Sequence, residues 1–159
     1  MINLDFLSEQ NNDTLNDFYN ITEGNIILGG SSILKINKII DRNVGNLNLV
    51  LNQSDSKYMD DIIKKYDLTF ISKQKYGIEN ETYWFRRDKS HGVLFLTNEN
   101  FDFDLFDFDN VKLRVGTVEN LKHNKESLIE NSDTNSLKHY NDIELIEKFY
   151  GREFKKSII

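Results

Sequence analysis

The residues of this chain that could do chemistry begin with a glycine pair and a serine, Gly29, Gly30 and Ser31. They follow a short apolar run at residues 26–28, which is typical of a buried strand bounded by glycine. Glycines let a backbone come close to a phosphate. A helix that begins at Ser31 would direct free N–H groups and the positive end of its dipole towards that anion. The pattern predicts either an anion site or a tight strand-to-helix turn without a ligand.

Two asparagines, Asn46 and Asn48, alternate with leucines in a stretch that has the period of two expected for a strand. Side chains two residues apart on a strand point to the same face, so we expect Asn46 and Asn48 to lie together. Each asparagine offers a carbonyl oxygen but no charge. The alternative is a pair of polar residues on an exposed strand face.

Acidic residues alternate with aromatic ones further along the chain, where Asp104 stands in the run F-D-L-F and Asp102 precedes it on the same predicted face. This pattern favours a strand with one carboxylate face. Asp104 is then either a functional acid or a solvated residue on an alternating strand.

The order of these features resembles the nucleotidyltransferase fold superfamily. Over residues 25–51 the chain reads as an apolar strand, G-G-S, a helix, D-R-x-V-G and an alternating strand; F-D-L-F and two closing helices follow. The resemblance covers about residues 25–150. It implies an α+β fold, in which a nucleotidyltransferase-like mixed β-sheet is flanked by helices and two C-terminal helices form a small cap.

The resemblance also implies a magnesium site. The superfamily carries Asp-x-Asp on the second strand, whereas this chain has Asn46 and Asn48 at those positions. Its third carboxylate matches Asp104, the expected catalytic residue, which the resemblance places beside the two asparagines. Magnesium prefers hard, anionic oxygen ligands, so we expect the ion to be weakly bound or absent in this chain.

The nucleotide-binding residues implied by the resemblance are Gly29, Gly30, Ser31 and Lys125. The first three would hold the triphosphate of a nucleoside triphosphate, and the lysine would lie near the phosphates. For Lys125, a place on a solvated helix face is the alternative.

Three functions remain open from the sequence. An active nucleotidyltransferase would move a nucleoside monophosphate onto a hydroxyl of an RNA, a protein or a small molecule, with activity weak or lost because two metal-binding acids are asparagine. A natural pseudoenzyme would bind a nucleotide or a partner protein without turnover. The asparagines could also be engineered substitutions that silence an enzyme. The sequence leaves open whether the protein is an enzyme.

Composition limits the class of protein. The chain has 159 residues, of which 38% are hydrophobic and 29% charged, with a net charge of −6 and no cysteine. These values predict one folded domain over residues 1–159, with a core at about 25–115 and a helical part at about 117–151. They exclude disulfides and thiolate metal sites. The absence of alanine and proline, with abundant Asn, Lys and Ile, suggests an AT-rich phage or bacterial genome.

No apolar run approaches the roughly 18 residues of a membrane helix, and the N-terminus lacks a secretory pattern, so we expect a cytoplasmic protein without a membrane partner. A chain of this length has little room to recognise an acceptor. A partner protein or a homodimer would supply that function.

The elements that must position these residues follow from periodicity and turn residues. Helices are predicted at about residues 14–23, capped by Thr14, over 31–40, over 54–66, and at about 117–131 and 136–150, the last ended by Gly151. Short strands are predicted between 68 and 115, with connections at 88–92, 97–100 and 109–110. Trp84 and its aromatic neighbours are predicted to pack in the core or to stack on a base.

Overall fold

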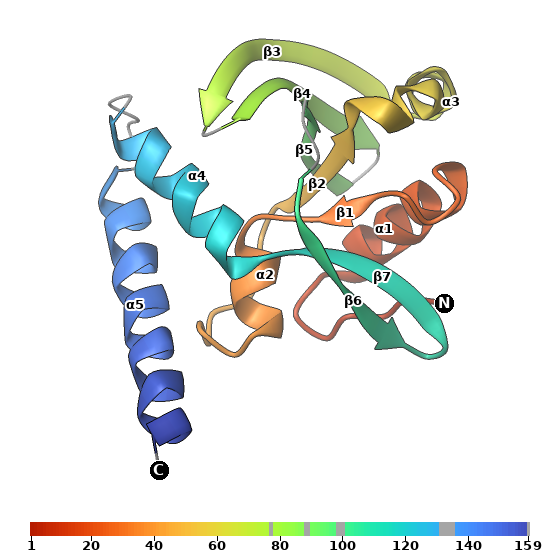
Figure 1. Cartoon of the computed structure of the whole chain (residues 1–159). Helices are drawn as coiled ribbons and strands as arrows, with labels where there is room; N and C mark the ends of the chain where they lie inside the picture. Colours follow the sequence, from red (N-terminus) through yellow and green to blue (C-terminus); the bar gives the residue numbers. More distant parts are fainter. Residues whose placement is uncertain (77, 88–89, 98–100, 131–135, 159) are drawn as a thin grey trace.

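The structure is a computed structural model that describes residues 1–76, 78–87, 90–97, 101–130 and 136–158 (Figure 1). Within these residues the chain is mixed α+β, with one seven-stranded sheet in the order β3-β4-β5-β2-β1-β7-β6 and five α-helices. The predicted fold class is confirmed at this level. The strands are β1 (Ile27–Leu28), β2 (Leu47–Asn52), β3 (Asp67–Tyr76), β4 (Ile78–Arg87), β5 (Ser90–Thr97), β6 (Phe103–Phe108) and β7 (Val111–Gly116). The helices are α1 (Glu9–Ile21), α2 (Ser31–Ile36), α3 (Met59–Lys65), α4 (Val118–Glu130) and α5 (Ser136–Ile158), with a 3₁₀ turn, η1 (Gln53–Tyr58), before α3.

The two-residue strand β1 lies inside the sheet, between β2 and β7 (Figure 1). β1 runs antiparallel to β2 and parallel to β7, and β2 runs parallel to β5. The unit β1–α2–β2 therefore forms in the order that the sequence predicts. The helix predicted over residues 31–40 is shorter, because Lys38 adopts φ 60 and the N–H of Ile39 returns to the carbonyl of Leu34 at 2.8 Å. These bonds close the helix at Ile36.

The alternation in β2 gives the sheet two different faces. Leu47, Leu49 and Leu51 are fully buried on the main-core face, which α1 covers with Leu15 and Phe18. Asn48, Val50 and Asn52 point to the opposite face, as the period of two requires. We call this opposite side the second face.

A small apolar cluster occupies part of the second face. Ile27, Val50 and Phe101 are buried there together. The side-chain oxygen of Asn52 accepts hydrogen bonds from the backbone N–H of Phe101 at 2.8 Å and from the Thr97 hydroxyl at 3.0 Å. Because Asn52 is buried, these bonds fix Phe101 over the centre of the second face.

Two antiparallel units extend the sheet on either side of its centre. β3, β4 and β5 form an antiparallel meander, and β6 pairs with β7 through the turn at Asp109 and Asn110, both with positive φ. The turn predicted at 109–110 is confirmed. Of the predicted connections at 88–92 and 97–100, residues 88–89 and 98–100 lie outside the described residues, and the remaining positions belong to β5.

Other helix bounds also depart from prediction, and the stretch predicted as one helix over 54–66 is the 3₁₀ turn η1 followed by α3. α1 begins at Glu9, where the Ser8 hydroxyl accepts a hydrogen bond from the N–H of Asn11 at 3.1 Å, so the predicted start at Thr14 is wrong. α5 continues beyond Gly151, which is therefore not its end. α4 begins as predicted, since the Thr117 hydroxyl accepts from the N–H of Asn120 at 3.2 Å.

The predicted start of α1 is wrong because asparagines in this helix form hydrogen bonds with residues that precede it. Asn12 and Asn16 accept hydrogen bonds from the N–H groups of Leu4 and Ile2, both at 2.8 Å. They bind the N-terminal segment to the helix, so the polar residues before Thr14 belong to α1.

Among the described residues, no helix has the length and apolarity required to cross a membrane.

Candidate functional site

The candidate site begins at the turn between β1 and α2. Gly30 has φ 61 and ψ −147, a backbone conformation that is essentially restricted to glycine. The N–H of Gly29 donates to the carbonyl of Asn48 at 2.9 Å, and the carbonyl of Gly30 accepts from Ile33 at 3.1 Å. Ser31 is then the first residue of α2 and is half-buried. The first of these bonds joins the turn to β2, and the second lies at the start of α2.

Asn48 lies directly against this turn. A Cβ atom added to Gly30 would lie 2.9 Å from both Cβ and Cγ of Asn48, closer than real Cβ atoms approach other atoms. Position 30 therefore requires glycine both for its conformation and for its contact. Gly30 and the Asn48 side chain are therefore in direct contact.

Asn46 does not accompany Asn48 in the strand. β2 begins at Leu47, and Asn46 lies in the preceding bend with an exposed side chain, whereas Asn48 is half-buried. The expectation of two asparagines side by side on one strand is therefore wrong for Asn46. The alternation of polar and apolar residues begins one position before the hydrogen-bonded strand does.

The neighbours of Asn48 on the second face are uncharged. In β5 its register partner is Val93, and the register partner of Val93 in β4 is Trp84. On the other side of β2, Asn48 adjoins Gly29 and Gly30, the two residues that follow β1. Register partners on adjacent strands point to the same face, so the residues best placed to share a metal ion with Asn48 lack carboxylates.

Asp104 lies elsewhere in the sheet. It belongs to the edge strand β6, which β7 and β1 separate from β2, so three strand spacings of about 14 Å in all divide the strands. Asp104 is the register partner of Val115, Val115 that of Leu28, and Leu28 that of Leu49. Asp104 therefore lies on the main-core face rather than on the face of Asn48. The expected position of Asp104 beside Asn46 and Asn48 is therefore wrong, and Asp104 is solvent-exposed.

The residues present do not fit a magnesium ion at Asn48. One amide oxygen with apolar strand neighbours is a poor ligand set for a hard cation that prefers carboxylates. Among the described residues, no group of three or more His, Cys, Asp or Glu side chains could hold a metal. The ligand set implied by the resemblance is therefore not assembled.

Lys125 has a different environment from the one expected. Its side chain is 7% exposed, and its ammonium pairs with a carboxylate oxygen of Asp142 at 2.9 Å. Asp142 is 1% exposed and also pairs with Arg42 at 3.1 Å. His139 approaches the same ammonium with Nδ1 at 3.3 Å. We call Arg42, Lys125, His139 and Asp142 the ionic cluster; Lys125 and Asp142 are buried, whereas the Arg42 side chain is 43% exposed.

This cluster joins three segments. Arg42 comes from the loop after α2, Lys125 from α4, and His139 and Asp142 from α5. Lys138 and Asp142 are four residues apart on α5, a spacing that allows an ion pair, but the Lys138 side chain lies outside the described residues. The position of Lys125 is explained by its ion pair. Its sequence signal, a lysine on an amphipathic helix, did not identify Asp142 as its partner or Arg42 as the second cation on Asp142.

The aromatic triplet around Trp84 is divided between the two faces. Phe85 is 1% exposed in the main core, whereas Trp84 is 42% exposed and shares the second face with Val93. Tyr83 donates a hydrogen bond to Glu81 at 2.7 Å, and burial, together with that bond and the Glu81 charge, raises the pKa of Tyr83 to about 12. The phenol is therefore neutral at physiological pH. Only Trp84 remains as a stacking candidate of this triplet.

A hydroxyl close to the turn is left without a partner. Ser32 is fully buried in α2, and its oxygen has no hydrogen bond among the described residues. Buried polar atoms are normally paired, so this orphan is a local cost that the sequence did not predict.

Asn48→Asp combined with Val93→Asp is expected to create a site for a divalent cation. The two carboxylates would face each other across β2 and β5 and repel without an ion. A bound cation at ten times its Kd would then stabilise the variant by about 1.4 kcal/mol. Thermal unfolding with Mn²⁺ and with EDTA measures this difference, and the parent chain is the control. Equal stability of the variant under both conditions would contradict the placement of Val93 beside Asn48.

Comparisons with protein-family models, with curated proteins and with solved structures give no match to this chain.

Proposed function

We propose that this chain is a nucleotidyltransferase-like protein that binds a nucleoside triphosphate at Gly29, Gly30 and Ser31 without metal-dependent transfer. The observation that carries the proposal is the contact between Gly30 and Asn48, at the strand-to-helix turn where the superfamily has its nucleotide site. The order strand, glycine turn, helix and strand supports the binding part of the proposal.

The lack of transfer follows from charge. In metal-dependent transfer, divalent ions neutralise the phosphates and activate the attacking hydroxyl. Asn48 and Val93 supply no negative charge to hold such ions, and Asp104 is on another part of the sheet. Loss of even about 4 kcal/mol of transition-state stabilisation would lower the rate roughly a thousandfold. We therefore assign the chain to binding rather than catalysis.

Nucleotide binding is expected to be independent of magnesium. Isothermal titration calorimetry with ATP, GTP, CTP and UTP, each with magnesium and with EDTA, would give Kd values that agree within about twofold, or roughly 0.4 kcal/mol, for any one nucleotide. Incubation with ATP that carries a radiolabelled α-phosphate would give no labelled product and no pyrophosphate.

The outcome that contradicts the proposal is specific. Binding of none of the four nucleotides would remove the binding function. A Kd that weakens tenfold or more in EDTA, or release of pyrophosphate by the parent chain, would instead show a functional metal site and an active enzyme. Gly45→Ala is a matched control for the integrity of the preparation, because a Cβ at Gly45 meets nothing within 4 Å.

A further inference from the structure

Trp84 is an exposed aromatic residue in the same row of the sheet as Asn48. The row runs from Trp84 in β4 through Val93 in β5 to Asn48 in β2. Two strand spacings separate its ends, about 10 Å in all. The row ends at Gly30, whose backbone lies against the Asn48 side chain. An aromatic plane and the candidate phosphate turn are therefore at opposite ends of one short path.

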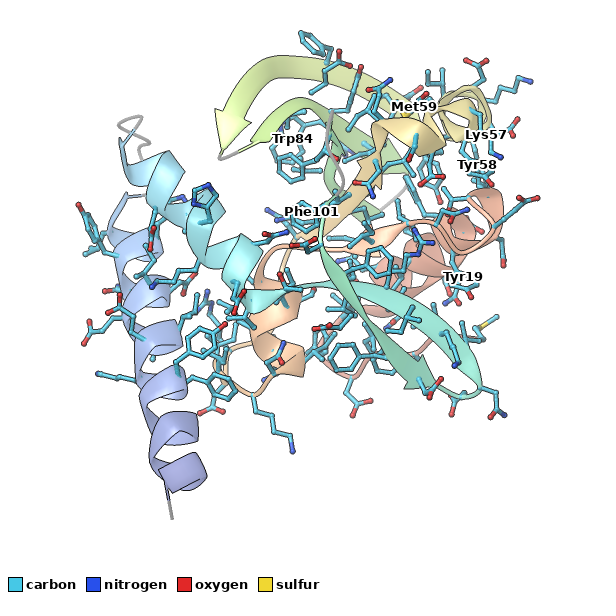
Figure 2. The ribbon with its side chains drawn as sticks, viewed as in Figure 1. Tyr19, Lys57, Tyr58, Met59, Trp84 and Phe101 are labelled. Carbon is cyan, nitrogen blue, oxygen red and sulfur yellow. The ribbon has the colours of Figure 1, made fainter. Side chains whose placement is uncertain are left out.

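This row differs from the next one in how it is covered. Phe101 is fixed over Val50 and Ile27, and all three are buried. Trp84 is 42% exposed, and Val93 and Asn48 are half-buried. Figure 2 labels the side chains of Trp84, on β4, and of Phe101, in the segment before β6. Phe101 thus closes one part of the second face, and the row with Trp84 stays accessible beside it.

The chemistry of the row suits a flat heteroaromatic ring. The indole of Trp84 offers a stacking plane, and Val93 continues the apolar surface. The Asn48 amide carries both donors and an acceptor, and it makes no side-chain hydrogen bond among the described residues. Such an amide can pair with the polar edge of a base. The three residues carry no negative charge that would repel an attached phosphate chain.

We propose that Trp84 is the base-stacking residue of a nucleotide whose phosphates lie at Gly30. This inference rests on the proposed function, because it identifies how the same site would recognise its ligand. Stacking on an aromatic side chain tolerates different bases, so the row selects for the presence of a base rather than for one base.

Trp84 is the only tryptophan of the chain, so its fluorescence reports on this row directly. ATP is expected to quench the emission, whereas inorganic tripolyphosphate, which lacks a base, is expected to leave it unchanged. By calorimetry, Trp84→Ser should weaken ATP binding about tenfold, the effect of losing one stacked base, and should leave tripolyphosphate binding unchanged. Trp84→Phe should retain most of the ATP affinity.

Phe70→Ser is the matched control, because Phe70 is also an exposed aromatic residue of the β3–β4 hairpin. Its register partner is Tyr83, so it lies on the opposite face from Trp84. It should leave the ATP affinity unchanged. Circular dichroism verifies that each variant is folded.

The two proposals fail in different ways. Equal ATP affinity of the parent chain and Trp84→Ser, without quenching, would overturn the role of Trp84 and leave the proposed nucleotide binding intact. Failure of the parent chain to bind any nucleotide would overturn both. An equal loss of ATP and tripolyphosphate affinity in Trp84→Ser would show a structural role and would also overturn the inference.

Discussion

Gly30→Ala is expected to destabilise the protein by about 3 kcal/mol, which corresponds to a decrease in Tm of roughly 10 °C for a domain of this size. One part of the loss is conformational, because alanine strongly disfavours φ 61 with ψ −147. The other part is steric, because the new Cβ would overlap the Asn48 side chain. Thermal and urea unfolding measure the total.

A second variant separates these two parts. Gly30→Ala combined with Asn48→Ala removes most of the overlapping atoms and leaves the backbone conformation unchanged, so it should recover part of the loss. Gly45→Ala, with no atom within 4 Å of its new Cβ, should change stability by less than about 0.5 kcal/mol. A Gly30→Ala protein as stable as the parent would contradict the described turn.

Asp142→Ala is expected to have the largest effect on stability, a loss of about 3–5 kcal/mol. The carboxylate is 1% exposed and is the shared partner of Arg42 and Lys125. Its removal leaves the Lys125 ammonium without this ion pair in a site where it is 7% exposed. Urea unfolding measures the change in free energy.

The control lies on the same helix. Glu144 pairs with Lys148 at 3.1 Å, but their side chains are 63% and 65% exposed. Glu144→Ala should therefore change stability by less than about 0.5 kcal/mol. Asp142→Leu combined with Lys125→Met removes both charges and should be more stable than Asp142→Ala. Similar losses for Glu144→Ala and Asp142→Ala would contradict the burial of the ionic cluster.

Local patterns predicted the parts of the site that depend on neighbouring residues. The alternation over residues 46–52 fixed the leucines on one face and Asn48 on the other. The glycine pair marked the turn before α2, and Thr117 marked the start of α4. In each case a few consecutive residues contain the whole physical cause.

Long-range pairing explains what local patterns missed. The sequence shows that residues 103–106 favour a strand, but the distance of Asp104 from Asn48 depends on the insertion of β1 and β7 between their strands. The partner of Lys125, Asp142, likewise comes from another helix, α5, and the second cation on Asp142, Arg42, comes from a distant loop. The sequence alone can predict the face of Trp84. Consecutive residues of a strand point to opposite faces, and its neighbour Phe85 is a core residue.

The position of β1 has a consequence for how the protein is synthesised. β1 has only two residues and hydrogen-bonds to strands on both sides: Ile27 is paired with Val50 in β2 and with Arg114 in β7. A nascent chain that has reached only β5 can form the first of these pairings but not the second. The glycine turn next to β1 then lies beside an open strand edge until β7 leaves the ribosome. Contacts between such distant segments slow folding, so the part of the sheet that carries the glycine turn should be among the last parts of the protein to become rigid.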